Sequence, residues 1–180
     1  NGPNVLEESG VGRSDITASV GGAGGVADGI PLTFTLAIVD VASHAALAGA
    51  AVYAWHCDAE GRYSMYSDGV TEENYLRGVV AADANGLATF RSIFPGCYQG
   101  RWPHIHFEVY ENVDAASNGG NAIKVSQLAF PQTVCEAAYV DARYPDSAGN
   151  LGQLSLATDG VFADDQAAQQ LAVVAGSNDA

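Results

Sequence analysis

The segment of the sequence richest in reactive groups is 97–107, which reads CYQGRWPHIHF. His104 and His106 are separated by one residue, and side chains two positions apart on a β-strand point to the same face. Two imidazoles on one face, about 7 Å apart along the strand, can converge on one metal ion. A strand histidine can also be an ordinary core or surface residue, so a metal site needs further ligands.

The strand that would carry these histidines is expected at residues 104–110, because its side chains alternate in character. His104, His106, Glu108 and Tyr110 fall on one face, and the residues between them are apolar. A tyrosine, Tyr98, precedes the strand. Its phenol has a reference pKa of about 10, but a trivalent cation favours the phenolate strongly enough to bind it at neutral pH. Ordinary packing is the alternative for Tyr98 taken alone.

The elements that must position these groups are short strands joined by turns. Residues 1–29 form a glycine-rich N-terminal arm, and residues 30–180 form the domain. Asn85-Gly86 predicts a type I′ hairpin turn, residues 58–74 a long functional loop, and residues 133–140 a short helical turn. Residues 165–171 favour helix, whereas 171–174 suit a strand. The remaining strands are expected at residues 30–40, 50–56, 78–83, 87–92 and 123–130.

This succession of strands, without a βαβ rhythm, predicts an all-β protein: an antiparallel β-sandwich with long functional loops and little helix. With 180 residues, of which 48% are hydrophobic, the chain suits one domain with a substantial core. The net charge of −14 argues against nucleic acid or an anionic membrane as a partner. We find no apolar run long enough for a membrane helix and expect a soluble protein.

Four ordered motifs give the chain a family resemblance over roughly residues 10–162. They are WHCDAEGRYS at 55–64, YLRG at 75–78, IFPGCY at 93–98 and RWPHIHF at 101–107. The set resembles the intradiol ring-cleavage dioxygenases, and the four motifs in order are far more specific than any one of them.

The resemblance implies a metal centre and a reaction. It implies one non-haem ferric ion, Fe(III), with O2 as co-substrate and a small aromatic diol of the catechol type as substrate. The ring would be cleaved between its two hydroxylated carbons to a cis,cis-muconate-type diacid. The implied protein ligands are Tyr63, Tyr98, His104 and His106.

Two further residues gain roles from the same resemblance. Arg101 is implied as the cation that stabilises negative charge developing on the catecholate, and Gln127 matches a glutamine on a late strand near the iron. Tyr98 is the ligand implied to leave the metal when substrate binds. Arg62 and Arg77 are pocket or loop-anchoring candidates without a catalytic role.

The sequence departs from the family pattern in three places. The family more often has Arg-Pro-Ala-His-Ile-His, so the bulky Trp102 is expected to alter the pocket wall. The helical segment that forms the dimer interface of the cytosolic enzymes is missing, which favours the single-domain, often exported members and hence an extracellular or periplasmic location. Cys57 lacks the partner common in such members, which leaves a Cys97–Cys135 disulfide as a hypothesis.

Two other functions compete with the dioxygenase. One is a non-catalytic secreted β-sandwich that binds a ligand through its aromatic and histidine face. The other is a divalent-metal hydrolase, for which Glu108 is the one carboxylate close to the histidines. The identity of the catechol and the oligomeric state stay open from the sequence.

Overall fold

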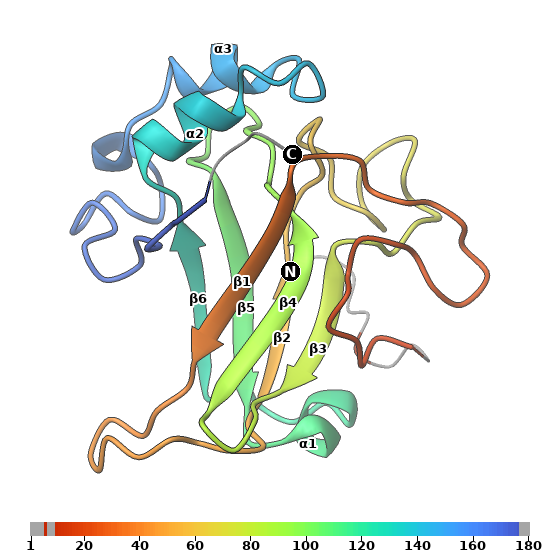
Figure 1. Ribbon diagram of the computed structural model, residues 1–180, viewed down its shortest axis with the longest axis vertical. Coiled ribbons are helices and arrows are strands. Elements are labelled where there is room, and N and C mark those ends of the chain that lie inside the picture. The colour runs from red at the N-terminus through yellow and green to blue at the C-terminus, as the bar shows by residue number, and fades with distance from the viewer. Residues whose placement is uncertain (1–5, 7–9, 177–180) are drawn as a thin grey trace.

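The computed structural model describes residue 6 and residues 10–176, and within them six strands form two antiparallel sheets (Figure 1). The larger sheet has the order β3 (Arg77–Ala81), β2 (Ala51–Trp55), β5 (His104–Tyr110), β6 (Lys124–Ala129), and the smaller pairs β1 (Pro31–Ala37) with β4 (Leu87–Ile93). The helical segments are short: α1 (Val113–Ser117), α2 (Gln132–Ala138), α3 (Ser147–Leu151) and the 3-10 turn Leu156–Thr158. The all-β architecture with little helix is confirmed.

Strand β5 has the two faces that its sequence predicts. Ile105 and Val109 point into the core between the sheets and are 0% and 5% exposed. Phe34 of β1 and Phe90 of β4 stack at 4.9 Å between ring centroids in the same core. Burying each such side chain contributes about 1.5–3 kcal/mol, so this face fixes the register of β5 and turns the histidines to the other side.

The prediction of a hairpin at Asn85-Gly86 is wrong, although the spans predicted for its two strands are close to those of β3 and β4. β3 pairs with β2 and β4 pairs with β1, so the turn carries the chain from one sheet to the other. A type I′ turn needs a positive φ at both central residues, whereas only Gly86 has one, at 76°. Asp83 instead stabilises the observed turn, because its Oδ1 accepts hydrogen bonds from the backbone N–H groups of Asn85 and Leu87.

The described part of the N-terminal arm lies against both sheets. The backbone N–H of Arg13 donates to Val79 O of β3, and that of Ile16 donates to Arg91 O of β4. The Ile16 side chain is fully buried. The rest of the predicted arm, residues 1–5 and 7–9, lies outside the described residues.

The C-terminal region follows neither of the two predictions made for it. Residues 161–170 form consecutive turns, and Gln166 and Ala167 have φ values of 56° and 58°, which a right-handed helix excludes. Leu171 makes a single bridge to Ala129 at the end of β6 in place of a strand. The helical turn at 133–140 is confirmed by α2, and the loop at 58–74 contains no helix or strand.

The three cysteines are buried as free thiols, so the Cys97–Cys135 disulfide is not formed. Each sulfur faces a backbone oxygen instead: Cys57 Sγ lies 3.4 Å from Gly96 O, Cys97 Sγ 3.9 Å from Arg101 O, and Cys135 Sγ 4.0 Å from Phe130 O. The described residues include no helix long and apolar enough to span a membrane.

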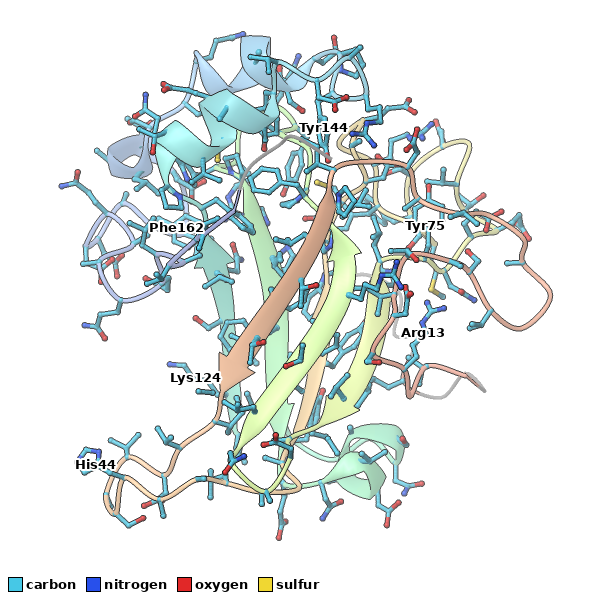
Figure 2. The ribbon with its side chains drawn as sticks, viewed as in Figure 1. Arg13, His44, Tyr75, Lys124, Tyr144 and Phe162 are labelled. Carbon is cyan, nitrogen blue, oxygen red and sulfur yellow. The ribbon has the colours of Figure 1, made fainter. Side chains whose placement is uncertain are left out.

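The loops are distributed between the two ends of the sandwich. α1 lies at one end, while α2 and α3 lie at the other (Figure 1). Figure 2 shows His44 at the end near α1, whereas Phe162 and Tyr75 lie toward the opposite end. His44 is exposed and plays no part in the site described next.

Candidate metal centre

Three donor atoms from distant parts of the chain meet at one point on the outer face of the large sheet. His104 Nε2 and His106 Nε2 are 3.0 Å apart. Tyr63 Oη lies 3.4 Å from the first nitrogen and 3.2 Å from the second. Ligands about 2.1 Å from one ion and at right angles to each other are separated by about 3.0 Å. The triangle therefore has the dimensions of one face of a metal coordination sphere.

His104 presents an unprotonated nitrogen to this point. Its Nδ1 lies 2.5 Å from the backbone oxygen of Trp102, which can only accept, so the ring proton resides on Nδ1. Burial lowers the pKa of His104 to about 4. The imidazole is therefore neutral at pH 7, with the lone pair of Nε2 free for a ligand.

His106 is held by stacking. Its ring is parallel to that of Trp55 on β2, with 4.7 Å between centroids, and Trp55 stacks in turn on Tyr53 at 4.8 Å. Burial, with the neighbouring His104, lowers the pKa of His106 to about 3. Both histidines are thus neutral donors, which is the form that binds metals.

Tyr63 comes from the long loop at 58–74, and a buried carboxylate shapes the start of that loop. Asp58 accepts hydrogen bonds from the backbone N–H groups of Glu60 and Arg62, from Arg62 Nε, and from the hydroxyl of Tyr75. The loop is therefore fixed on both sides of Tyr63.

Both arginines that the sequence marked as loop anchors contact this region. Arg62 forms the hydrogen bond to Asp58 described above and an ion pair with Glu60. Arg77 Nη2 donates to Ser64 O at 2.8 Å and ties the loop to β3.

Tyr98 lies beside Tyr63 and lines the same cleft. The two rings meet edge to face, with 5.7 Å between centroids. Two glycines allow this approach, because a Cβ on Gly61 would lie 3.0 Å from Tyr98 Cβ and one on Gly96 would lie 2.6 Å from Asp58 O. Burial raises the pKa of both phenols. Each therefore keeps its proton unless a cation replaces it.

Arg101 is held next to the histidines by three contacts. Its Nε donates to Asp159 Oδ2 at 3.0 Å, its Nη2 donates to Gln127 Oε1 at 2.6 Å, and the guanidinium lies 5.8 Å from the centre of the Phe162 ring. Gln127 is the β6 residue opposite His106. The two candidates Arg101 and Gln127 thus form one unit, in which the glutamine orients the guanidinium.

Asp159 is the residue that the sequence did not reveal. It is 2% exposed, and besides Arg101 it accepts hydrogen bonds from the backbone N–H groups of Trp102, Val161 and Phe162. Burial alone would raise the pKa of Asp159, but these hydrogen bonds lower it below the usual value. In the sequence it precedes a glycine, which is the common signature of an exposed turn.

Trp102 does not form the wall of the pocket, contrary to the prediction. It is 3% exposed and packs in the core, with its Nε1 donating to Phe130 O at 2.9 Å. An indole of this size gains most by full burial when its N–H finds an acceptor, and Phe130 supplies one.

A cleft of about 910 Å³ opens over the candidate centre. It runs along the outer face of the large sheet from Tyr63 and Tyr98 toward Glu108. The lining residues are Tyr53, Trp55, Tyr63, Tyr66, Arg77, Tyr98, His106, Glu108, Tyr110, Val125, Ser126, Gln127, Val161 and Gln170.

The described residues contain no group of three or more histidine, cysteine or carboxylate side chains suited to a metal ion. Glu108 instead accepts a hydrogen bond from the hydroxyl of Tyr110. The ligand set of the hydrolase alternative is therefore absent from this part of the chain. The phenol oxygen of Tyr63 instead lies within 3.4 Å of the Nε2 atoms of His104 and His106.

Comparison with known proteins places the chain in a family. Residues 1–117 match the dioxygenase family, which is more than half of the 180 residues. An intradiol ring-cleavage dioxygenase from Tetranychus urticae is 28% identical, with a TM-score of 0.73 over 91% of this chain and 78% of that one. The chain belongs to the intradiol ring-cleavage dioxygenase family.

Two more distant structures share the fold. The dioxygenase domain of a carbohydrate-binding fusion protein from Streptomyces sp. SirexAA-E is 24% identical, with a TM-score of 0.58 over 92% of this chain and 79% of that one. Catechol 1,2-dioxygenase from Pseudomonas arvilla C-1 is 24% identical, with a TM-score of 0.50 over 68% of this chain and 42% of that one. The family match ends before Gln127 and Asp159, so the contacts of these two residues rest on the structure alone.

Proposed function

We propose that the chain is an intradiol dioxygenase that cleaves a catechol-type ring between its two hydroxylated carbons, with O2 as co-substrate and a cis,cis-muconate-type diacid as product. One non-haem iron(III) ion would be held by Tyr63, Tyr98, His104 and His106. The observation that carries the proposal is the meeting of the Nε2 atoms of two neutral imidazoles and a partly buried phenol within 3.0–3.4 Å of one another, in a chain of this family.

The chemistry of the donor set fits a trivalent ion. Two neutral imidazoles add no charge, and two phenols become anions only beside a strong Lewis acid, since burial raises the pKa of each. The two phenolates together would offset most of the 3+ charge and disfavour reduction of the ion. Bound there, iron(III) supplies the Lewis acidity that makes a catecholate reactive toward O2.

The residues of the chain supply the proton transfer and charge stabilisation. Tyr98 lines the cleft and is partly buried, as Tyr63 is, and the family resemblance makes Tyr98 the ligand that would turn away and hold a proton taken from a substrate hydroxyl. Arg101 directs its positive charge at the same region, where negative charge develops on the substrate. Gln127 and Asp159 keep the guanidinium in place.

The test separates binding of iron from turnover. Replacing His104 with alanine should abolish iron binding, the tyrosinate-to-iron colour and turnover together. Replacing Arg101 with glutamine should leave iron content and colour intact while lowering kcat/KM by about 10²-fold, the size of effect found for a single charge-stabilising group. The measurements are iron content, visible absorption and O2 uptake with catechol. An iron-loaded protein without colour, or full turnover in the His104 variant, would overturn the proposal.

A further inference from the structure

The cleft extends well beyond the candidate centre, and Glu108 lies in this outer part. It follows His106 by two residues on the same face of β5, which places the two about 7 Å apart along the strand. Its neighbours across the sheet are Tyr53 of β2 and Val125 of β6. The volume of about 910 Å³ is at the large end of the range of about 300–1,000 Å³ for small-molecule sites. A ring substituent therefore has room to reach Glu108.

The carboxylate of Glu108 has capacity left for a ligand. One oxygen, Oε2, accepts a hydrogen bond of 2.5 Å from the Tyr110 hydroxyl. Burial and the adjacent carboxylate raise the pKa of Tyr110, which therefore remains a neutral donor. No described residue donates a hydrogen bond to the other oxygen of Glu108, and the side chain is only partly buried.

The other charged side chain of the cleft, Arg77, is already occupied. Arg77 is 3% exposed, and its guanidinium donates to Ser64 O and Oγ and, at 3.2 Å, to the Tyr53 hydroxyl. In the outer part of the cleft a ligand thus meets a partly buried carboxylate with a free oxygen and a sequestered guanidinium, whereas Arg101 lies at the other end, beside the histidines. The net charge of −14 adds to this negative potential.

Tyr53 and Trp55 form an aromatic wall beside Glu108; they stack on each other and both line the cleft. Trp55 also stacks on His106, so this wall offers apolar contact to a substrate, and the charge in this part of the cleft comes from Glu108.

We propose that Glu108 determines specificity: the cleft selects catechols whose ring carries a short side chain ending in a cationic amine over those with a side chain ending in a carboxylate. The inference rests on the proposed function, since it assumes that the diol end of the ligand binds at Tyr63, Tyr98 and the histidines. A single-ring diol then points its substituent along β5 toward the free oxygen of Glu108.

The test uses two probes of similar length and opposite charge. They are 2-(3,4-dihydroxyphenyl)ethylamine and 3-(3,4-dihydroxyphenyl)propionate, with 4-ethylcatechol as the neutral reference. For the iron-loaded wild type, kcat/KM should be at least about tenfold higher for the amine than for the carboxylate at low salt. Glu108→Gln should bring this ratio to within about threefold of unity and leave the neutral reference nearly unchanged. Glu111→Gln removes the same charge from an exposed residue outside the cleft and should keep the wild-type ratio.

Two readouts keep this inference distinct from the proposed function. Cleavage of 4-ethylcatechol at equal rates in all three proteins, with an unaltered amine-to-carboxylate ratio in Glu108→Gln, would overturn the role of Glu108 while leaving the dioxygenase activity standing. Failure of the iron-loaded wild type to consume O2 with 4-ethylcatechol would overturn the proposed function. Calorimetric dissociation constants measured without O2 test Glu108 independently of turnover. Equal affinity for amine and carboxylate in the wild type would overturn the inference.

Discussion

Asp159 is the anchor on which the position of Arg101 depends, and its replacement by asparagine should affect both stability and turnover. The carboxylate accepts one hydrogen bond from the guanidinium and three from backbone N–H groups. An asparagine side chain has one acceptor oxygen, and its NH2 group would face donors. The change therefore removes the negative partner of Arg101 and leaves buried N–H groups without an acceptor.

The expected loss in the free energy of unfolding is about 3 kcal/mol. Removing one partner of a buried ion pair typically costs about 3–5 kcal/mol, and the lower end applies because the Arg101 side chain is 21% exposed and keeps its bond to Gln127. Because the hydrogen bonds lower the pKa of Asp159 below its unfolded value of about 3.9, its contribution is complete above about pH 5 and is lost as the pH falls below that value.

The assay is urea denaturation at pH 7, combined with kcat/KM on catechol. Asp159→Asn should lower the unfolding free energy by about 3 kcal/mol and kcat/KM at least tenfold, with iron content unchanged. Asp15→Asn is the matched control, because it weakens an exposed ion pair with Arg91 and should change neither quantity appreciably. Wild-type stability and turnover in Asp159→Asn would refute the claim that this carboxylate positions Arg101.

Three other changes test separate parts of the site. Gly96→Ala should destabilise the protein by about 1–3 kcal/mol in urea denaturation, because the new Cβ would lie 2.6–2.9 Å from the backbone of residues 58 and 59; Gly149→Ala, with no atom near its Cβ, is the control. Burial lowers the pKa of His56 from 6.5 to about 4, so the unfolded chain binds a proton at this residue before the folded chain does. This residue alone should therefore reduce the free energy of unfolding by up to about 1.4 kcal/mol per pH unit as the pH falls from 6.5 toward 4. A pH series in which His56→Gln keeps the wild-type slope would contradict this. Tyr98→Phe should retain part of the visible absorption, which then comes from Tyr63 alone, but lose turnover, and a variant with wild-type kcat would exclude Tyr98 as the proton-holding ligand.

The strand that carries the histidines could be predicted because its pattern is local. Alternation along residues 104–110 fixed both its extent and its two faces, and the structure agrees to the residue. Which strand each one pairs with could not be predicted from the local pattern, because pairing depends on residues distant in the sequence. The Asn85-Gly86 pair suggested a hairpin, but a hydrogen-bonding aspartate two residues before it and the apolar face of β4 directed the chain to the other sheet.

For the candidate centre, the sequence predicted the residues that lie within motifs and missed those that lie outside them. Residues from the four motifs do lie together. The carboxylate that holds Arg101, however, is Asp159, which lies 58 positions further along the chain in a turn that shows no hydrophobic periodicity. The role expected for Trp102 failed for a related reason. The size of Trp102 suggested that it forms a pocket wall. In the structure its Nε1 donates to the buried backbone oxygen of Phe130, a contact that no sequence pattern predicts.

The most direct test of the central claim is the stoichiometry of O2 uptake and ring cleavage in the iron(III)-loaded protein. Catechol should be consumed with one O2 per ring, the muconate absorbance should rise at the same rate, and both should disappear in His104→Ala. The account is contradicted if the protein binds one iron(III) per chain with tyrosinate colour and yet consumes O2 without forming the muconate-type diacid, or consumes none.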